Sequence, residues 1–325
     1  MHLISRKLAL IAGVIAMSCA FVPVGAQTFP TRSLRMIVPF APGGGIDIVG
    51  RIVAQRLSDA LGQPVVVDNR SAAGGTFGTN LTAKAAPDGH TLLTNSISMA
   101  VNATLYAKLP YDTLKDLAPV GSIGRQPSIV VVHPALAAKS IGELLALARA
   151  KPGQLNYGSG GMGSVTFLST ELLKLMTQVD IKHVPYKGLG PALIDLMGGQ
   201  TQVIVSTMAT ALPALKSGRI RALAVTTAKR STFFPDLPTL DEAGVPGYEF
   251  STWYALLATG GTPKSVIARL SREMAGILNS DALKEQFSAQ GIETAYSSPD
   301  AFAAYLKSEV AKWGKVVKAT GATPE

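Results

Sequence analysis

Two glycine-rich segments are the parts of this 325-residue sequence with the composition and position for binding chemistry. The first, Val38–Arg51, reads VPFAPGGGIDIVGR and follows a short apolar run. Its prolines cannot extend a strand's hydrogen bonds, and Gly43–Gly45 allow a tight turn into a helix predicted from Ile46. The first N–H groups of a helix have no partner within it, and the helix dipole adds partial positive charge there. The segment is therefore typical of an anion-binding turn.

The second segment, Tyr157–Ser164, reads YGSGGMGS and precedes another amphipathic run. Ser164 is placed as the N-cap of that helix, and Ser159 adds a second hydroxyl. Both segments can also be explained as structural turns, with Ser164 acting only as a cap. Their recurrence in two separate α/β series favours a cleft that closes on a ligand with anionic groups.

Side chains for catalysis or metal binding are sparse. The sequence has no G-x-S-x-G motif. Its few histidines beyond the first residues and its single cysteine are far apart, at His90, His133, His183 and Cys19. We expect these histidines to be structural and expect no metal site. Asp47 fits a first-turn partner of the helix dipole, and Lys187 fits either a solvated lysine or a partner for a ligand carboxylate.

Composition narrows the class of protein. Apolar residues make up 47% of the chain and charged residues 16%, which is enough apolar material for two domains. The net charge is +9, but the basic residues are scattered singly. This distribution argues against nucleic-acid binding and is compatible with anionic small ligands.

The first 26 residues have the pattern of an export signal. Arg6-Lys7 precede an apolar stretch, and Val24-Gly25-Ala26 fits a cleavage site. We expect cleavage after Ala26 and a periplasmic mature chain without cysteine. The alternative, a lipidated Cys19, has a poor lipobox before it.

The first glycine segment lies in an alternating series of strands and helices. Strands are predicted at 36–38, 64–68 and 91–94, with helices between them, so the sheet is parallel with right-handed crossovers. Ligands bind outside the carboxyl ends of such strands, where Phe40–Gly45 and Thr94–Ser96 fall. The β-branched stretch 120–132 is expected to cross between lobes.

A second series contains the other glycine segment. Its predicted strands are 155–157, 181–184, 203–205 and 222–226, with helices at 141–150 and from 165. A strand at 253–258 and two terminal helices follow. The last helix places Phe302, Leu306, Val310, Trp313 and Val317 on one inward face.

The chain resembles the Bug-type extracytoplasmic solute receptors of tripartite tricarboxylate transporters over essentially its whole mature length. The motifs that carry the resemblance are PFAPGGGIDIVGR, LYAKLPYD, NYGSGGMGS, VPYKGLGPALIDLMGGQ and FPDLPTLDEAGVPGYE. The resemblance implies an α/β, two-lobed periplasmic binding protein (Venus-flytrap) fold, each lobe a mixed sheet flanked by helices. It also implies a monomeric receptor that captures a small carboxylic acid and delivers it to membrane permease subunits, with no cofactor and no catalysis.

The resemblance further implies the ligand contacts. These would be Phe40, Ala41, Gly44, Gly45, Asn95 and Ser96 in the first lobe, and Ser159, Gly160, Gly163, Ser164, Tyr186 and Ser206 in the second. The sequence departs from the family pattern at Ile46, at Met99, at Phe167 and at Ser206, where relatives often have an acidic residue nearby. Without that acid a substrate amine loses its partner, which argues against amino-acid ligands.

The expected domains are a leader, 1–26, a discontinuous first lobe, 27–123 and 230–325, and a second lobe, 124–229.

The alternative to a receptor is an exported α/β enzyme, dinucleotide-binding or hydrolytic. Gly43-x-Gly45 and Asp68 fit a dinucleotide fingerprint in part, but its third glycine falls at Ile48.

Overall fold

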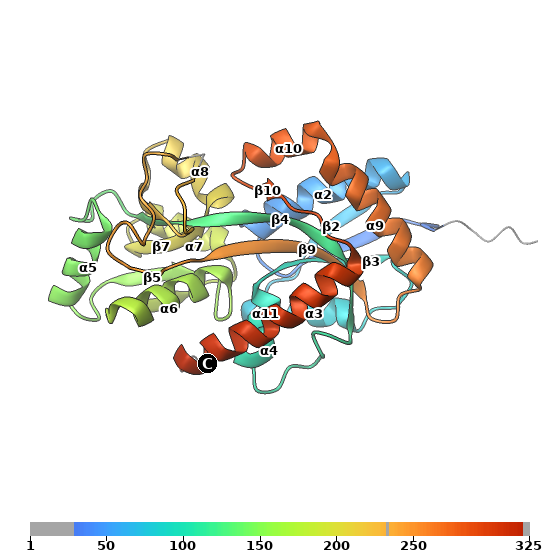
Figure 1. Ribbon diagram of the computed structural model, residues 1–325, viewed down its shortest axis with the longest axis horizontal. Helices are drawn as coiled ribbons and strands as arrows, with labels where there is room; N and C mark the ends of the chain where they lie inside the picture. Colours follow the sequence, from blue (N-terminus) through green and yellow to red (C-terminus); the bar gives the residue numbers. More distant parts are fainter. Residues whose placement is uncertain (1–28, 232–233, 321–325) are drawn as a thin grey trace, which may run out of the picture. The chain divides into compact units, whose positions relative to one another are not determined.

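Two long strands join the lobes. They are β4 (Leu117–Val132) and β9 (Ser251–Thr259), which run side by side and antiparallel in Figure 1. The computed structural model describes residues 29–231 and 234–320, so the predicted leader at 1–26 lies outside the described residues. From Arg32 onward the chain is one α/β unit with two lobes. The predicted fold class is confirmed, and the crossing strand predicted at 120–132 is β4.

The first lobe contains a mixed sheet in the order β2-β1-β3-β9-β4. β1 (Leu34–Val38) lies between β2 (Val65–Asn69) and β3 (Thr91–Ser96), and both pairings are parallel, as predicted. β9 then pairs antiparallel with β3 and with the first two thirds of β4, and the short β10 (Glu293–Thr294) pairs with β4. The apolar residues of β1 are fully buried, which fixes the start of the first glycine segment.

The second lobe contains the other part of the sheet. Residues 128–132 of β4 lie between β7 (Val203–Thr207) and β8 (Arg221–Val225), and both pairings are antiparallel. β5 (Asn156–Ser159) pairs in parallel with β7 and with β6 (Lys182–Pro185). One strand, β4, therefore belongs to the sheets of both lobes.

Helices flank each lobe. In the first lobe these are α2 (Gly45–Leu61), the 3-10 turn η2 (Ala73–Gly75), α3 (Thr76–Ala83), α4 (Ser98–Leu105), α9 (Lys264–Asn279) and α10 (Asp281–Ser288). In the second they are α5 (Ile141–Ala150), α6 (Val165–Thr177), α7 (Leu189–Met197) and α8 (Met208–Lys216). α4 and α8 have no clear sequence signal. α4 is buried on most sides, which removes the amphipathic pattern, and α8 contains Pro213, which disfavours a helix interior. No described helix is long and apolar enough to span a membrane.

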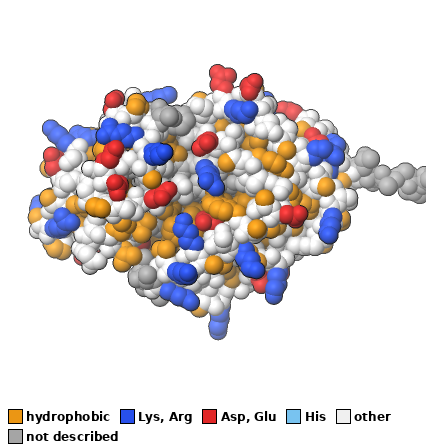
Figure 2. Space-filling view, viewed as in Figure 1, with side chains coloured by type: hydrophobic (Ala, Val, Ile, Leu, Met, Phe, Trp, Pro, Cys, Tyr) orange, Lys and Arg blue, Asp and Glu red, His pale blue; other side chains and the backbone are white. Residues whose placement is uncertain are grey.

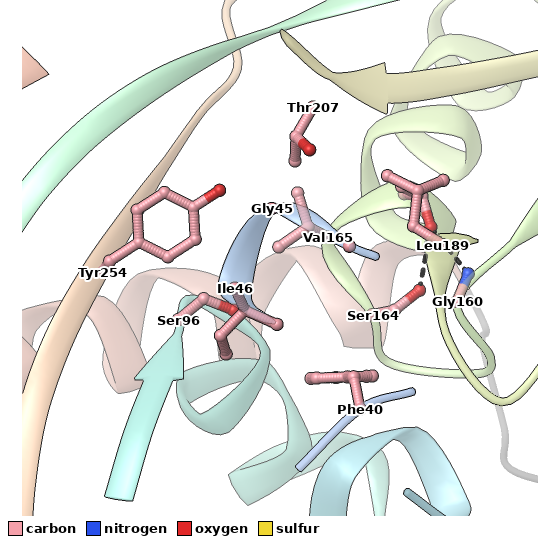
Figure 3. A pocket seen from close by; sticks show the side chains of 12 residues that line it. Phe40, Gly45, Ile46, Ser96, Gly160, Ser164, Val165, Leu189, Thr207 and Tyr254 are labelled. Carbon is pink, nitrogen blue, oxygen red and sulfur yellow. Dashed lines mark hydrogen bonds between the residues drawn. The ribbon is translucent and has the colours of Figure 1, made fainter. Parts of the chain in front are cut away.

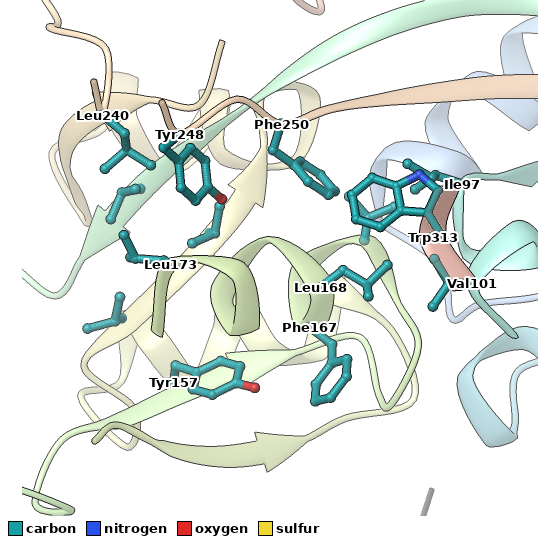
Figure 4. Packing of buried hydrophobic residues seen from close by; sticks show 14 of the residues in the cluster. Ile97, Val101, Tyr157, Phe167, Leu168, Leu173, Leu240, Tyr248, Phe250 and Trp313 are labelled. Carbon is teal, nitrogen blue, oxygen red and sulfur yellow. The ribbon is translucent and has the colours of Figure 1, made fainter. Parts of the chain in front are cut away.

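The terminal helix α11 (Pro299–Thr320) reaches both lobes. Trp313 packs edge-on to Phe250 with ring centroids 5.6 Å apart, and Figure 4 shows it between Ile97 of the first lobe and Leu168 of α6. The buried Glu309 accepts hydrogen bonds from the indole N–H groups of Trp253 (2.9 Å) and Trp313 (3.1 Å). Of the inward face predicted for this helix, Phe302, Leu306, Trp313 and Val317 are buried, and Val310 is partly buried against the same core.

The segment before β9 follows the second lobe. The N–H of Leu240 donates to the carbonyl of Val225, and the hydroxyl of Tyr248 donates to the carbonyl of Ser169 in α6. Leu240 and Tyr248, which were expected in the first lobe, therefore bond to residues of the second lobe. The division into 27–123 with 230–325, and 124–229, stays a prediction.

Candidate functional site

The first glycine loop joins β1 to α2 and is held by a network around Asp47. The buried carboxylate of Asp47 accepts hydrogen bonds from Gly43 N–H (3.0 Å), from Asn69 Nδ2 (2.8 Å) and from Arg51 Nε (3.0 Å). Gly43 has φ +88°, a left-handed conformation that favours glycine. Asp47 therefore acts in the structure as the partner of the loop backbone, in line with its interpretation as a first-turn helix partner.

The start of α2 offers free donors. Its N-cap, Gly44, makes no side-chain capping bond, and the described hydrogen bonds include none from the N–H groups of Gly45 and Ile46. A Cβ atom at Gly45 would lie 2.6 Å from both Thr207 Oγ1 and Tyr254 OH. Only glycine at this position lets the helix start approach β7 and β9 so closely.

The second glycine loop joins β5 to α6 and is held by hydroxyl groups. Ser164 caps α6 as predicted, because its Oγ accepts from the N–H of Phe167 at 3.3 Å. Thr166 Oγ1 accepts from the N–H of Gly160 at 2.8 Å and lies 3.1 Å from Ser164 Oγ. Gly163 has φ +76°, and a Cβ there would lie 2.0 Å from Asn102 Oδ1 of α4. The loop is thus fitted tightly against the first lobe.

A cavity of about 40 Å³ lies between the two loops. Figure 3 shows Gly45 and Phe40 from the first loop facing Ser164, Gly160 and Leu189 across it, with Tyr254 of β9 on a further side. The lining residues are Phe40, Gly44, Gly45, Ile46, Ser96, Gly160, Ser164, Val165, Thr166, Leu189, Thr207 and Tyr254. Among these described residues none carries a formal charge.

Four helices begin at this cavity. The lining includes the first residues of α2 (Gly45), α6 (Val165) and α7 (Leu189), and the N-cap of α8 (Thr207). Each N-terminus contributes partial positive charge and unpaired N–H groups. The cavity is therefore electropositive without a basic side chain, which is the environment that an anion prefers.

The floor of the cavity is polar and neutral. The hydroxyl of Tyr254 donates to Gln126 Oε1 at 2.6 Å, and burial raises the pKa of this tyrosine. Thr207 Oγ1 lies 3.0 Å from Thr210 Oγ1. Both side chains present hydroxyl groups that stay protonated near neutral pH.

A wider recess of about 570 Å³ lies on the outer side of Phe40. Phe40 and Gly160 line both spaces, so the recess adjoins the cavity. Tyr186 and Lys187 lie on the recess wall. The hydroxyl of Tyr186 donates to Asp195 at 2.6 Å, and burial together with this carboxylate raises the pKa of Tyr186 to about 12.

The structure brings most of the predicted contact residues together. Those lining the cavity are Phe40, Gly44, Gly45, Ser96, Gly160 and Ser164, and Tyr186 lines the outer recess. Ala41, Asn95, Ser159, Gly163 and Ser206 line neither space. Contact of any of these residues with a ligand stays a prediction.

The five residues outside the lining have other partners. Ala41 N–H donates to the Lys187 carbonyl at 3.0 Å, and Asn95 Nδ2 donates to Thr79 at 3.0 Å. Ser206 Oγ donates to the carbonyl of Thr207 at 2.9 Å. Gly163 faces Asn102 of α4. These residues are therefore engaged with other parts of the protein.

Ser159 bonds to a histidine behind the second loop. Its Oγ lies 2.6 Å from His183 Nε2 and accepts from the N–H of Gly161 at 3.0 Å. His183 stacks on Tyr157 at 4.8 Å, and burial lowers the pKa of His183 to about 4. Ser159 is fully buried and His183 is half-buried. The histidine is structural, as its sequence context indicated, and it orders the loop.

Thr207, Tyr254 and Leu189 were not among the predicted site residues. Thr207 is the last residue of β7 and follows Ser206. Because neighbouring side chains of a strand point to opposite faces, Thr207 faces the cavity and Ser206 does not. Tyr254 reaches the site through the antiparallel register that places it opposite Ser96. No local sequence motif marks either position. The described residues contain no cluster of three or more His, Cys, Asp or Glu side chains suited to a metal ion.

Comparison with known proteins agrees with the geometry. Residues 49–322 match the family described as the tripartite tricarboxylate transporter family receptor, TctC. Protein BugT of Bordetella pertussis is 42% identical over 320 residues, which cover 98% of each chain. R. palustris Rpa4515, solved with adipate, is 38% identical with a TM-score of 0.88, covering 91% of this chain and all of that one.

MatC (Rpa3494) from Rhodopseudomonas palustris, solved with bound malate, is 32% identical with a TM-score of 0.85. The match covers 89% of this chain and all of MatC. The predicted family is confirmed over most of the chain, and its members are solute receptors rather than enzymes. The chain belongs to the TctC family and is a periplasmic solute-binding receptor.

Proposed function

We propose that this receptor captures a small carboxylic acid between its lobes and delivers it to the membrane permease of a tripartite tricarboxylate transporter. The observation that carries the proposal is the uncharged cavity at which four helix N-termini meet. A carboxylate has up to four acceptor positions, which match N–H donors from the first turns of α2 and α6 together with the Ser164 hydroxyl. The predicted contacts of Phe40–Gly45, Ser96, Gly160 and Ser164 belong to this arrangement.

The energetics require both lobes. Charge-assisted hydrogen bonds contribute about 1.5–3 kcal/mol each, and a helix N-terminus adds about 0.3–1 kcal/mol. Micromolar affinity corresponds to about 8 kcal/mol after the cost of association. One loop alone supplies too few donors, so the ligand favours the state in which both loops face it.

The described contacts correspond to that closed state. Ala41 N–H donates across the cleft to the carbonyl of Lys187, and Gly188 and Gly190 approach Ala41 and Pro42 so closely that a Cβ on either would overlap the first loop. The lobes must separate for a ligand to enter. Opening breaks these backbone contacts, while β4 and β9 keep the lobes connected.

The proposal includes export. The chain loses residues 1–26 by cleavage after Ala26, acts in the periplasm and is a monomer when it meets the permease. Sequencing the N-terminus of the exported protein checks the cleavage, and a mature chain beginning at Cys19 would contradict it.

A thermal-shift screen tests the ligand class. The panel contains mono-, di- and tricarboxylates, aromatic acids, matched primary amides and amino acids, and calorimetry follows for every hit. We expect stabilisation by carboxylates and none by the amides, because an amide lacks the negative charge. We expect weak binding of amino acids, because no carboxylate among the described lining residues pairs with an ammonium group. Preferential binding of amines or amides would overturn the proposal.

A further inference from the structure

A glutamine behind the cavity floor has only one possible orientation. Gln126 lies on β4, where this strand crosses between the lobes, and its side chain is fully buried. Its Nε2 donates to the carbonyl oxygen of Gln290 at 2.9 Å. A backbone carbonyl accepts hydrogen bonds and never donates one, so the amide cannot be turned round. The amide oxygen, Oε1, therefore faces Tyr254, whose hydroxyl oxygen lies 2.6 Å away.

The hydrogen of the Tyr254 hydroxyl is committed by this orientation. Two oxygen atoms at 2.6 Å repel each other unless a hydrogen lies between them, and the amide oxygen of Gln126 carries none. Tyr254 therefore donates to Gln126 and has no hydrogen left for a ligand. Its oxygen still accepts hydrogen bonds. Thr207 lies beside it at the floor, and one hydroxyl fills at most one of its acceptor positions.

The cavity consequently has a donor side and an acceptor side. N–H groups at the starts of α2 and α6 donate, whereas the oxygen of Tyr254 accepts. An ionised carboxylate has acceptors alone, so it fits the first side and is repelled by the second. The two sides meet at Gly45, the first residue of α2, where a Cβ would lie 2.6 Å from the Tyr254 oxygen. Figure 3 shows the Tyr254 hydroxyl directed towards Gly45 and Thr207. A ligand group that donates to Tyr254 therefore has to lie next to the carboxylate.

We propose that the cavity floor selects acids with a hydroxyl group on C2, and that Gln126 is the positioning residue that makes Tyr254 the acceptor of this hydroxyl. The carboxylate lies among the helix starts while the 2-hydroxyl donates to Tyr254. A plain methylene at C2 leaves that buried acceptor position empty, which costs binding free energy. This inference rests on the proposed function and narrows the substrate class to 2-hydroxy acids.

An ammonium group on C2 also has hydrogens to donate, but the cavity does not suit it. The helix N-termini already give the cavity positive potential, and no described lining residue is acidic. A neutral hydroxyl supplies the same hydrogen bond without that repulsion. The floor therefore favours a hydroxy acid over the amino acid of the same shape.

Calorimetry with two sets of matched probes tests the selection. The first set is 2-hydroxyglutarate, glutarate and glutamate, and the second is lactate, propionate and alanine. Within a set only the group on C2 differs, and the two sets differ in length. In at least one set we expect the better enantiomer of the hydroxy acid to bind the native receptor at least about fivefold more tightly than both other members.

Tyr254→Phe removes only the acceptor oxygen. The dissociation constant of the unsubstituted acid, divided by that of the hydroxy acid, should fall to about one in this variant. Tyr248→Phe is the matched control, because Tyr248 is a buried tyrosine that lines neither space and donates to the carbonyl of Ser169 at 2.7 Å. The ratio should stay at the native value in Tyr248→Phe.

Gln126→Met separates positioning from contact. Methionine has a similar length but no amide oxygen, so the hydrogen of Tyr254 is free to turn towards a ligand carboxylate. We expect the unsubstituted acid to bind about two- to fivefold more tightly than to the native receptor, and the ratio to fall. A merely structural role of Gln126 would weaken both acids equally and leave the ratio unchanged.

The outcomes separate the inference from the proposed function. If some carboxylate of the screen binds, but neither hydroxy acid binds more tightly than the other members of its set, the selection is wrong and the receptor function stands. The selection is also wrong if Tyr254→Phe keeps the native ratio, and the role of Gln126 is wrong if Gln126→Met keeps it. If no carboxylate in the screen binds, the proposed function fails and the selection fails with it.

Discussion

The two glycine loops lead into helix starts at the same cavity but are held by opposite means. The first loop has no side-chain cap and is fixed by a buried carboxylate, Asp47, with Arg51 and Asn69 around it. The second is fixed by the neutral hydroxyls of Ser164 and Thr166. Asp47 bonds at the start of the first loop, on Gly43, whereas the hydroxyls of the second loop line the cavity itself.

The contrast separates the roles of the loops. The carboxylate that orders the first loop is kept off the cavity wall, so it does not repel the ligand directly. The hydroxyls of the second loop can order its backbone and also bond to a ligand. We therefore expect substitution of Asp47, which holds the first loop, to reduce stability. We expect substitution of the hydroxyl residues of the second loop to reduce affinity for the ligand.

The largest effect should come from filling the point where the first loop meets the floor. Gly45→Ala places a methyl group 2.6 Å from Thr207 Oγ1 and Tyr254 OH, within a cavity of about 40 Å³. We expect about a 100-fold loss of affinity for the best ligand of the screen, from overpacking of about 1–3 kcal/mol and covered N–H donors.

Gly276→Ala is the control for this substitution. Gly276 is exposed on α9 and lies outside the cavity lining, and an added Cβ there meets no atom within 4 Å, so affinity should stay unchanged. Equal losses in the two variants, measured by calorimetry, would show that the close approach at Gly45 is irrelevant to binding.

The next effect should be on the stability of the first loop. Asp47→Ala removes three hydrogen bonds to a buried charged group, and we expect the free energy of unfolding to fall by about 2–3 kcal/mol. Urea unfolding measures this loss. Asp59→Ala, on an exposed turn of the same helix, should change it by less than about 0.5 kcal/mol. A native-like value for Asp47→Ala would contradict the charged scaffold.

The second loop should respond in affinity. Ser164→Ala removes both the α6 cap and a hydroxyl at the cavity, and we expect ligand binding to weaken by about 1–2 kcal/mol, about five- to thirtyfold. Ser140→Ala removes an equivalent cap, from α5, at a residue that does not line the cavity. It should lower stability by about 1 kcal/mol without changing affinity. If both serines affect binding alike, Ser164 acts only as a cap.

The smallest effect concerns the histidine behind the second loop. Burial is the main cause that lowers the pKa of His183 to about 4 from 6.5, so the folded state favours the neutral ring. Above about pH 6.5 the ring is neutral in both the folded and the unfolded chain, so this group does not lower the free energy of unfolding. As the pH falls from 6.5 towards 4, the unfolded chain binds a proton that the folded protein does not, and the free energy of unfolding declines. His183→Gln should flatten this acid-side decline in melting temperature, and His133→Gln should leave it unchanged. An identical decline in all three proteins would refute the assignment.

Local pattern predicted both loops, because the information lies within one strand–turn–helix unit. The apolar run before Pro39, the glycines and the Ser164 cap each act on neighbours a few residues away. The recurrence of this unit in two α/β series predicted the cleft, and the family resemblance supplied the list of contacts. One of these, Ser159, lies on the same face of β5 as Tyr157 and bonds to His183, and its contact with a ligand stays a prediction.

The floor of the cavity could not be predicted from local pattern. Tyr254 reaches it because β9 pairs with β3 in a particular register, some 160 residues from its partner strand in sequence. The position of Thr207 is set by the end of β7 and the start of α8. Helix propensity does not predict α8, because Pro213 lies inside it. Long-range register and context-dependent helices are decided by tertiary packing, which composition does not encode locally.

The neutral cavity has a consequence for the proton inventory of transport. Its lining contains no formally charged group among the described residues, and its one ionisable side chain, Tyr254, stays protonated because burial raises its pKa. Capture of a carboxylate therefore takes up and releases no proton at the cavity near neutral pH, and the binding heat should be the same in buffers of different ionisation enthalpy. Under the proposed function, the acid is therefore held in the cavity as its anion, and a proton or cation that balances its charge during translocation is recruited outside this cavity.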